Sequence, residues 1–479
     1  MMREFFSAIL HIGFVLAIGY YFMTSMQWYS YRIKRVLFHY NRYDWHLYFF
    51  VLPLLAYYFS EGLFVYVVYS FYAVVLFFWF KKLDRKLVFT SRIKRFFLFL
   101  FLAVLFQNLL CTLFVGCVKF GVIIPLVIAH FASIAFEKML FEGFKKEAKQ
   151  KIKQRTEMKV IAVTASYGKT SIKNFLAQIL SSKFNVYMTP RSVNTIGGII
   201  KDINESLPQN CDVYIVEAGA REKGDINEIA QLVNPHISIV GKIGEQHIEY
   251  FKTLENIRNT KMEIINSTRL EKAFVHVSAN VKANEKIVIF GSDLQNIKST
   301  LEGTFFDIEI NGVKESFTCK LLGDFNAINI CACVHVALTL GMSLPEIKKA
   351  IENLIGVEHR LQRIEAGGKL IIDDSFNGNF DGMISSYDLA STYQGRKVII
   401  TPGIVESTEN ANIALAQKID DIFDLVIITG TLNLKVLDLH VKKAEKIILD
   451  DKSKMQEILA NHTVAGDLIL FSNDAPNFL

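Results

Sequence analysis

Apolar residues crowd into the first third of this chain, and that uneven distribution limits its possible folds more than any motif does. Of the 479 residues, 51% are hydrophobic, slightly above the usual range of about 45–50%. Before Lys151 the excess forms five stretches: Phe5–Met26, Trp45–Phe59, Leu63–Phe80, Phe96–Val118 and Phe120–Phe136. A helix needs about 20 apolar residues to cross a bilayer. The sequence therefore predicts a membrane region at 1–144 with about five transmembrane helices, the Trp45 stretch being the shortest.

Basic residues between these stretches predict their orientation. Positive charges gather in three segments, 31–44, 81–95 and 145–158, whereas the intervening turns hold almost none. Lys and Arg favour the cytoplasmic side of a membrane, and five spans place all three segments on that side. We therefore expect a multi-pass membrane protein whose residues after the basic linker 145–158 lie in the cytoplasm. No small-residue cleavage pattern follows Met26, which argues against a cleaved signal peptide.

The charge and cysteine content exclude two other classes of partner. The formal net charge of +6 is largely loop charge that faces anionic membrane lipid, so no nucleic acid is expected. The six cysteines show no CxxC spacing of the kind that binds zinc. Cys331 and Cys333 lie in an apolar, helix-like run, and we interpret them as core thiols rather than metal ligands.

A nucleotide-binding pattern follows the linker. Residues 160–173 are VIAVTASYGKTSIK, an apolar run, a turn of small residues, and then a helix-like pattern. In such a strand–loop–helix unit the backbone N–H groups point at phosphate oxygens, a lysine neutralises the β- and γ-phosphates, and a threonine hydroxyl ligates Mg²⁺. The residues predicted to bind the nucleotide are Ser166, Gly168, Lys169, Thr170 and Ser171. Position 163 is Val, where the usual P-loop has its first glycine.

The rest of the chain alternates short β-branched runs with amphipathic stretches. Such alternation favours an α/β fold with a parallel-rich sheet covered by helices. One set of runs lies at 159–363, and a second, smaller set lies at 364–479. We therefore expect transmembrane helices followed by a P-loop central domain and a smaller Rossmann-like C-terminal domain.

Seven further segments share a pattern with a known family. They are Thr189–Gly198 (TPRSVNTIGG), Val213–Ala220 (VYIVEAGA), Glu245–Phe251 (EQHIEYF), Asn259–Ile264 (NTKMEI), Leu321–Asn329 (LLGDFNAIN), Glu358–Leu361 (EHRL) and Ile371–Asn379 (IIDDSFNGN). With the P-loop, and in this order, they resemble the Mur ligases, ATP-dependent amide-forming enzymes of bacterial peptidoglycan precursor synthesis. The resemblance runs from about residue 159 to the end and does not include the membrane region. Ala165 replaces a glycine of the family P-loop.

The resemblance implies specific roles, which we state as expectations. It is strongest to the branch that adds D-Ala-D-Ala to UDP-MurNAc-tripeptide through an acyl phosphate, using ATP and two Mg²⁺ ions, in the cytoplasm beneath a bacterial inner membrane. Catalytic roles fall to Lys169, Lys261, His247 and Asn194; nucleotide contacts to Ser166, Gly168, Lys169, Thr170, Ser171, Asn326, Arg360 and Asp374; metal ligation to Thr170, Glu217, His247 and Lys261; and acceptor contacts to Ser375, Asn377 and Asn379. Lys261 matches a lysine that the family carbamylates, which would turn an ammonium into an oxygen ligand.

Two alternatives stay open at this point. The membrane spans stand where the family has a small domain for the UDP-sugar, so the acceptor is either soluble and UDP-linked or attached to a lipid. A different class of protein, a membrane-anchored nucleotide-binding regulator without ligase activity, is favoured by Ala165 and the unusual fusion. A sensor needs neither a carbamylated lysine nor an acceptor loop, so the regulator is opposed by the combination of Lys169, Glu217, His247, Lys261, Asp374 and Asn377.

Overall fold

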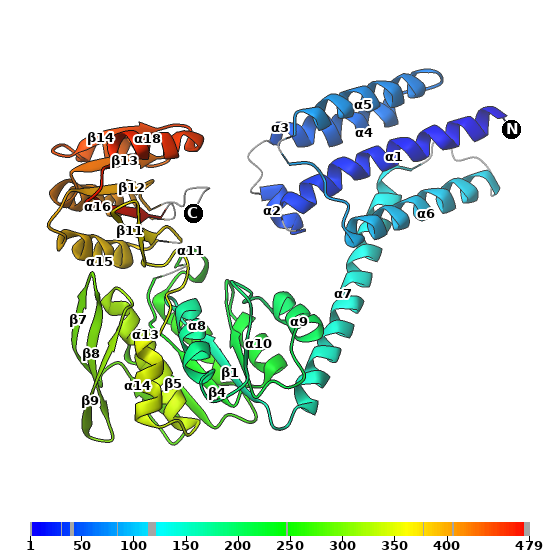
Figure 1. The fold of residues 1–479 in the computed structure, drawn as a ribbon. Coiled ribbons are helices and arrows are strands. Elements are labelled where there is room, and N and C mark those ends of the chain that lie inside the picture. The colour runs from blue at the N-terminus through cyan, green and yellow to red at the C-terminus, as the bar shows by residue number, and fades with distance from the viewer. Residues whose placement is uncertain are drawn as a thin grey trace. The chain divides into compact units, whose positions relative to one another are not determined.

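The computed structural model describes residues 2–29, 31–38, 43–83, 85–113, 121–245, 248–376, 378–404 and 407–473. The chain divides into two compact units, Met1–Gly143 and Phe144–Leu479 (Figure 1). We describe each unit by itself.

The first unit is entirely helical in its described residues. Its elements are α1 (Met2–Trp28), α2 (Ile33–Phe38), α3 (Tyr43–His46), the π-helical η1 (Leu47–Val51), α4 (Leu52–Phe59), α5 (Phe64–Lys81), α6 (Ser91–Leu113) and the start of α7 (Ile123–Gln154). Within the described residues, four helices are long and apolar enough to cross a membrane: Phe6–Trp28, Phe64–Lys81, Ser91–Cys111 and Ile123–Gln154. They match four of the five expected spans.

The fifth expected span, Trp45–Phe59, is divided among α3, η1 and α4. Pro53 stands in the first turn of α4, directly after the π-helical turn. Because proline has no backbone N–H and crowds the preceding turn, it interrupts a regular helix. This stretch is therefore helical but is not one long regular helix, and the total of five spans stays a prediction.

Helix α1 is the centre of the first unit. It packs against η1, α5 and α6, and Phe14, Val15 and Ile18 are almost completely buried there. Large apolar side chains also cover the outside of the unit, where Phe64 and Phe131 are 73% and 64% exposed. An outward surface this apolar is unfavourable in water and suits contact with lipid.

Helix α7 continues past the apolar region, and its last turns belong to the second unit. Lys145 pairs with Glu228 at 2.5 Å, and Lys151 donates to the carbonyl of Asn204 at 2.8 Å. The predicted linker 145–158 is therefore helical through Gln154, and polar contacts hold it against the middle domain.

A six-stranded parallel sheet forms the middle of the second unit. Its strands are β1 (Lys159–Thr164), β2 (Val186–Met188), β3 (Val213–Glu217), β4 (Ile237–Val240), β5 (Lys272–His276) and β6 (Ile287–Phe290). Their order is β2-β3-β1-β4-β5-β6, so the connections run in opposite directions on the two sides of β1. Ligands bind at the carboxyl ends of strands at such a switch point, which here is the end of β1.

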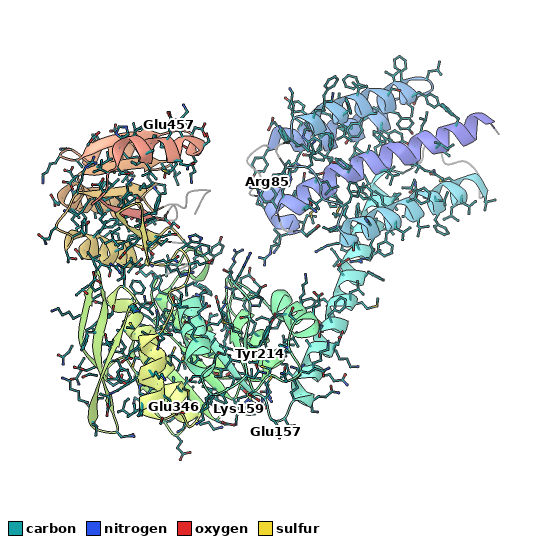
Figure 2. The ribbon with its side chains drawn as sticks, viewed as in Figure 1. Arg85, Glu157, Lys159, Tyr214, Glu346 and Glu457 are labelled. Carbon is teal, nitrogen blue, oxygen red and sulfur yellow. The ribbon has the colours of Figure 1, made fainter. Side chains whose placement is uncertain are left out.

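Helices cover the sheet, and side-chain alternation decides which residues face them. The helices are α8 (Lys169–Leu180), α9 (Ile196–Glu205), α10 (Asp225–Val233), α11 (Ile248–Phe251), α12 (Leu254–Met262), α13 (Asp324–Thr339) and α14 (Leu344–Glu352), with short 3₁₀ turns η2 (Glu263–Ile265) and η3 (Val277–Ala279). Ile161, Val213 and Ile215 pack with α8 and α13 in one core. Because side chains alternate along a strand, Glu217 lies on the same face as Val213, at the α8 side. Lys159 and Tyr214, on adjacent strands, are labelled in Figure 2.

One part of the middle domain is not predicted by the sequence. An antiparallel sheet of β7 (Leu294–Thr300), β8 (Gly303–Ile310) and β9 (Val313–Cys319) follows β6. Strands β7 and β9 are mostly polar and partly exposed, so they lack the apolar runs that identify the buried parallel strands.

The C-terminal domain is a second α/β layer structure, as expected. Its strands are β10 (Gln362–Ala366), β11 (Lys369–Asp374), β12 (Lys397–Thr401), β13 (Leu425–Thr429), β14 (Glu445–Leu449) and β15 (Leu468–Ser472), and its helices are α15 (Phe380–Ser391), α16 (Glu409–Ile422), α17 (Leu434–His440) and α18 (Met455–His462), with η4 (Lys452–Lys454). The order is β10-β11-β15-β12-β13-β14, and β10 is the antiparallel member of the sheet. The predicted fold class is confirmed for both α/β domains.

Candidate active site

The P-loop is the turn between β1 and α8, and its geometry requires glycine at one position. Gly168 precedes the first residue of α8 with φ of +80°. A Cβ atom there would stand 2.3 Å from Oδ1 of Asn329. Both the left-handed backbone and the close neighbour therefore exclude a larger residue. The N-terminal turn of α8 is thus open to an anion.

Ala165, the departure from the family pattern, fits the loop. Its backbone is not among the positive-φ positions of the described chain, so no glycine is needed there. The residue is fully buried and close to Gly241, where an added Cβ would lie 2.9 Å from the Ala165 methyl group. Because Gly241 has no side chain, there is room beside it for the Ala165 methyl group.

Lys169 folds back into the loop. Its Nζ donates to the carbonyl oxygens of Ala165 at 2.7 Å and Ser166 at 3.0 Å. Burial lowers the pKa of Lys169 to about 8, against the opposing charge of Glu217. The negative charge of a bound triphosphate would favour the charged form of the Lys169 ammonium group. Its phosphate oxygens would also replace the carbonyls of Ala165 and Ser166 as hydrogen-bond acceptors for Nζ.

Glu217 connects three of the residues around the P-loop. Its Oε1 accepts hydrogen bonds from the Thr170 hydroxyl at 3.3 Å and the Asn194 amide at 3.1 Å. Its Oε2 is 3.2 Å from Nζ of Lys173 and, among the described residues, accepts no hydrogen bond. The side chain of Glu217 is only 1% exposed. A hydroxyl and a carboxylate with a free lone pair are the oxygen donors that Mg²⁺ requires, so Thr170 and Glu217 fit such an ion.

Lys261 is buried at the last turn of α12, with 3% of its surface exposed. Burial lowers its pKa well below the usual range, and the charge of Lys169 adds to the effect, while Asp225 and Glu217 oppose it. A depressed pKa raises the share of the neutral amine, which is the nucleophilic form of lysine. An ordinary solvated lysine is therefore excluded at this position.

The junction with the C-terminal domain supplies the opposite wall. His359 and Leu361 have φ of +62° and +50°, and the Leu361 N–H donates to Asp374 at 3.2 Å. Nδ1 of His359 is 2.7 Å from Oδ2 of the buried Asp373. Arg360 stands between His359 and Leu361 in the chain, and its guanidinium carbon is 5.0 Å from the centre of the Phe376 ring. Burial raises the pKa of Asp374 to about 7, partly offset by the Leu361 N–H and Arg360.

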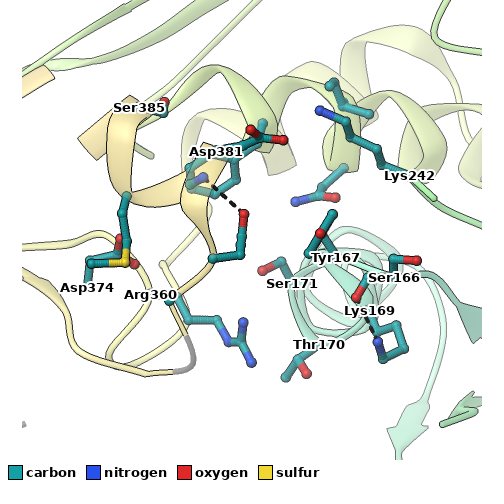
Figure 3. A pocket seen from close by; sticks show the side chains of 18 of the residues that line it. Ser166, Tyr167, Lys169, Thr170, Ser171, Lys242, Arg360, Asp374, Asp381 and Ser385 are labelled. Carbon is teal, nitrogen blue, oxygen red and sulfur yellow. Dashed lines mark hydrogen bonds between the residues drawn. The ribbon is translucent and has the colours of Figure 1, made fainter. Parts of the chain in front are cut away.

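These two walls enclose a cavity of about 290 Å³. Figure 3 shows the Arg360 side chain extending from the junction toward Thr170 at the start of α8. Lys242 and Asp381, which also line the cavity, lie in the upper part of the same view. The cavity lining combines charged and hydroxyl side chains with aromatic and aliphatic ones, a combination that suits a nucleotide, whose phosphates are charged and whose base is flat and largely apolar.

Most predicted site residues meet at this cavity. Its lining includes Ser166, Gly168, Lys169, Thr170, Ser171, Arg360, Asp374 and Asn379. Asn194 and Glu217 lie directly behind Thr170 through the bonds described above. Asn326 and Ser375 are buried outside the lining, where Asn326 donates to the Leu322 carbonyl and Ser375 to Asp373. His247 and Asn377 lie outside the described residues, so their roles stay predictions.

Sequence reasoning missed several residues of the site. The main one is Lys173, which is fully buried and pairs with Glu217. Its spacing of four residues from Lys169 places both on one face of α8, and that spacing is the signal that could have identified it. Tyr167, Lys242, Asn329 and Asp381 also line the cavity. Tyr167 lies inside the P-loop pattern and Asn329 ends the segment Leu321–Asn329, whereas nothing in the local sequence of Lys242 or Asp381 distinguishes them from surface residues.

Comparison with known proteins identifies a matching domain and similar ligases. The profile of the Mur ligase middle domain matches residues 163–337. UDP-N-acetylmuramoyl-tripeptide–D-alanyl-D-alanine ligase of Bacillus subtilis is 25% identical over 342 residues, covering 66% of this chain and 73% of that protein. The ligase of the same name from Borreliella burgdorferi is 30% identical over 304 residues, 60% of this chain and 65% of that protein, slightly under two thirds of its length.

A solved structure shows the same fold. MurF ligase from Thermotoga maritima, crystallised in complex with ADP, superimposes with a TM-score of 0.61 at 24% identity, covering 70% of this chain and 80% of that one. The two proteins therefore share the same fold over this part of the chain. Residues 163–337 therefore match a Mur ligase middle domain, and the chain is similar to ATP-dependent ligases of the MurF type.

Proposed function

We propose that this chain joins D-Ala-D-Ala to UDP-MurNAc-tripeptide in an ATP-dependent reaction beneath the bacterial cytoplasmic membrane. The observation that carries the proposal is the shared cavity. Lys169 and Thr170 of the P-loop side and Arg360 and Asp374 of the opposite wall line one space, and Glu217 lies behind Thr170 as its hydrogen-bond acceptor. The proposed substrates are those in the names of the two similar ligases from Bacillus subtilis and Borreliella burgdorferi. The four apolar helices support a multi-pass location in contact with lipid, and no nucleic acid is required.

The residues around the P-loop handle charge in the first step. A carboxylate oxygen of the tripeptide attacks the γ-phosphorus of ATP, and ADP leaves, which produces an acyl phosphate. Lys169 and the N-terminal turn of α8 stabilise the charge that moves onto the phosphate oxygens. Thr170 and Glu217 would hold Mg²⁺, which neutralises the β- and γ-phosphates when bound. Arg360 approaches the same phosphates from the other wall as a bidentate donor.

The second step forms the amide bond. The amine of D-Ala-D-Ala attacks the acyl carbon, a tetrahedral intermediate collapses, and inorganic phosphate leaves with the nitrogen losing a proton. Asn379, which lines the cavity and caps α15 through Gly382, would position the acceptor together with Ser375 and Asn377. Asp374 would accept hydrogen bonds from the ribose, and His247 would complete the metal site.

Lys261 is proposed to be carbamylated. The depressed pKa described above favours the neutral amine, and this form adds to CO₂ and releases one proton to give an anionic carbamate. That oxygen ligand, beside Glu217, would hold a second Mg²⁺. The Lys261→Ala variant is expected to bind ATP but to lose ligation. In full-length protein supplied with ¹³C-labelled bicarbonate, a carbamate NMR signal is expected in the wild type and not in this variant. An identical spectrum in both would disprove the modification.

A phosphate-release assay on the purified full-length protein tests the function. ATP and D-Ala-D-Ala are supplied with UDP-MurNAc-tripeptide or with a polyprenyl-linked muramoyl tripeptide. Turnover with the soluble substrate supports the proposal. Turnover with the lipid-linked substrate alone establishes the lipid variant of the same chemistry, which the apolar helices favour. ATP binding with no phosphate release from either substrate would establish the regulator instead.

A further inference from the structure

A second group of chemically reactive side chains lies outside the catalytic cavity. Asp293 follows β6, directly before β7, and Cys331 and His335 stand on α13. None of the three lines the cavity. Helix α13 and β7 are in contact and lie side by side in Figure 1. The spacing of four residues places Cys331 and His335 on one face of α13, one turn apart. We call Asp293, Cys331 and His335 the α13 cluster.

The ligand atoms of the α13 cluster converge on one point. Nε2 of His335 is 2.6 Å from Oδ2 of Asp293, and Sγ of Cys331 is 3.7 Å and 3.8 Å from the two carboxylate oxygens. All three ligand atoms lie within 4.8 Å of one another. No other group of three such side chains forms in the described residues.

Neighbouring groups orient these side chains. The Gly291 N–H donates to Oδ1 of Asp293 at 2.7 Å, which leaves Oδ2 directed at the cluster. The His335 ring stacks on Phe274 with a centroid distance of 5.8 Å. Such outer contacts fix the direction of metal ligands in proteins.

The chemistry of the set selects the ion. One thiol, one imidazole and one carboxylate form a mixed sulfur, nitrogen and oxygen set, which suits Zn²⁺ far better than Mg²⁺. Cys331 is fully buried, whereas the side chains of His335 and Asp293 are 16% and 18% exposed. Water therefore reaches the outer side of the cluster and can supply a fourth ligand.

A modest movement makes room for the ion. Zinc bonds of about 2 Å in tetrahedral geometry separate a nitrogen and an oxygen ligand by about 3.3 Å. The present His335–Asp293 distance of 2.6 Å is a hydrogen bond, so the ion would replace the shared proton with a shift under about 1 Å. The thiol proton of Cys331 would be released as well.

We propose that Asp293, Cys331 and His335 bind one zinc ion, with water as the fourth ligand. The ion ties the β6–β7 connection to α13, the helix whose first turns bring Phe325 and Asn329 to the catalytic cavity. The role of this ion is structural, because the cluster lies outside the cavity and the proposed amide-forming reaction does not involve the zinc ion. This proposal replaces the interpretation of Cys331 as a core thiol rather than a metal ligand, and it leaves that interpretation unchanged for Cys333.

Metal binding by full-length protein in detergent tests the site. Chelator-stripped protein is titrated with Zn²⁺ against a chromophoric competitor, with excess Mg²⁺ present so that the catalytic ligands are occupied. We expect one equivalent bound by the wild type, and at least tenfold weaker binding by Cys331→Ser and His335→Gln. The matched control is Cys333→Ser, on the same helix, where the thiol donates to the carbonyls of Ile172 and Asn329. It should bind zinc like the wild type.

Cobalt substitution provides a readout that needs no variant. Wild-type protein loaded with Co²⁺ is expected to show a thiolate-to-cobalt charge-transfer band, which only a cysteine ligand produces. Absence of this band, or equal zinc affinity in Cys331→Ser and Cys333→Ser, would reduce the cluster to an Asp–His ion pair beside a thiol. Neither result depends on ligase activity, so failure here leaves the proposed function untouched.

Discussion

Replacing Lys173 by methionine is the sharpest test of how the catalytic centre is assembled. Lys173 and Glu217 are 0% and 1% exposed and 3.2 Å apart, and Lys173 also donates to the Arg191 carbonyl. Methionine keeps most of the side-chain length but removes the positive charge. The variant would leave the carboxylate of Glu217 buried beside two neutral donors, Thr170 and Asn194.

The expected cost follows from that burial. Removing one partner of a buried ion pair typically destabilises a protein by about 3–5 kcal/mol. Because Thr170 and Asn194 still donate to Glu217, we expect the lower end, about 3 kcal/mol. For a unit as long as Phe144–Leu479, 1 kcal/mol lowers Tm by about 2 °C, so the predicted loss is about 6 °C.

The metal dependence makes the prediction specific. In EDTA, Glu217 of the Lys173→Met variant has lost its partner, whereas bound Mg²⁺ and nucleotide would supply a new positive charge. Mg²⁺ with ADP should therefore raise the Tm of the variant more than that of the wild type. The assay is thermal unfolding of the full-length protein in detergent, with and without Mg²⁺–ADP.

Two variants control this experiment. Lys201→Met removes an exposed lysine that is 3.8 Å from Glu205, and exposed pairs contribute about 0–1 kcal/mol, so its Tm should hardly change. Lys173→Met combined with Glu217→Gln removes both charges and should recover much of the loss in EDTA. If Lys173→Met unfolds at the wild-type temperature, or if the double variant is no more stable, Glu217 does not depend on Lys173 for its counter-charge.

Three further predictions concern the other wall of the cavity. Burial raises the pKa of Asp374 to about 7, so this pKa is higher in the folded protein than in the unfolded chain. The stabilisation of the folded state by the bound proton is complete below about pH 4 and is lost as the pH rises through about 7. Calorimetric ADP affinity should rise from about pH 6 to about pH 8 as the carboxylate ionises, and Asp374→Asn should flatten both profiles; an unchanged pH profile in the variant would exclude Asp374 as the cause. His359→Asn, which keeps a side chain tolerant of positive φ but loses the 2.7 Å contact with Asp373, should cost about 1.5–3 kcal/mol in thermal unfolding, and His359→Ala should cost more because alanine resists that conformation; equal Tm values for the two would refute the backbone argument. Phe325→Ala, in the cavity lining, should weaken ADP binding about tenfold if the ring stacks on the base, measured by the same titration; unchanged affinity would place the base elsewhere.

The strands that the sequence identified correctly are those buried on both faces. Residues 160–164, 213–217 and 425–429 are continuous apolar, β-branched runs, and all are strands of parallel sheets. The antiparallel strands β7 and β9 were missed because one side of each faces water, so their sequences look like loops. The interruption of the Trp45–Phe59 stretch depended on Pro53 and a π-helical turn, which hydrophobicity alone does not record.

The sequence by itself determined the separation into an apolar helical region and two α/β domains, and it located the phosphate loop. These features follow from local periodicity, residue size and the conformational needs of single positions such as Gly168. Only the tertiary structure decided that Lys173 neutralises Glu217, that Asn326 and Ser375 lie outside the cavity lining, and that Asp293 meets Cys331 and His335. Each of these features depends on residues that are far apart in the chain and are buried together. Burial changes the strength of their electrostatic interactions and their pKa values, and burial is a property of the packed domain rather than of any one segment.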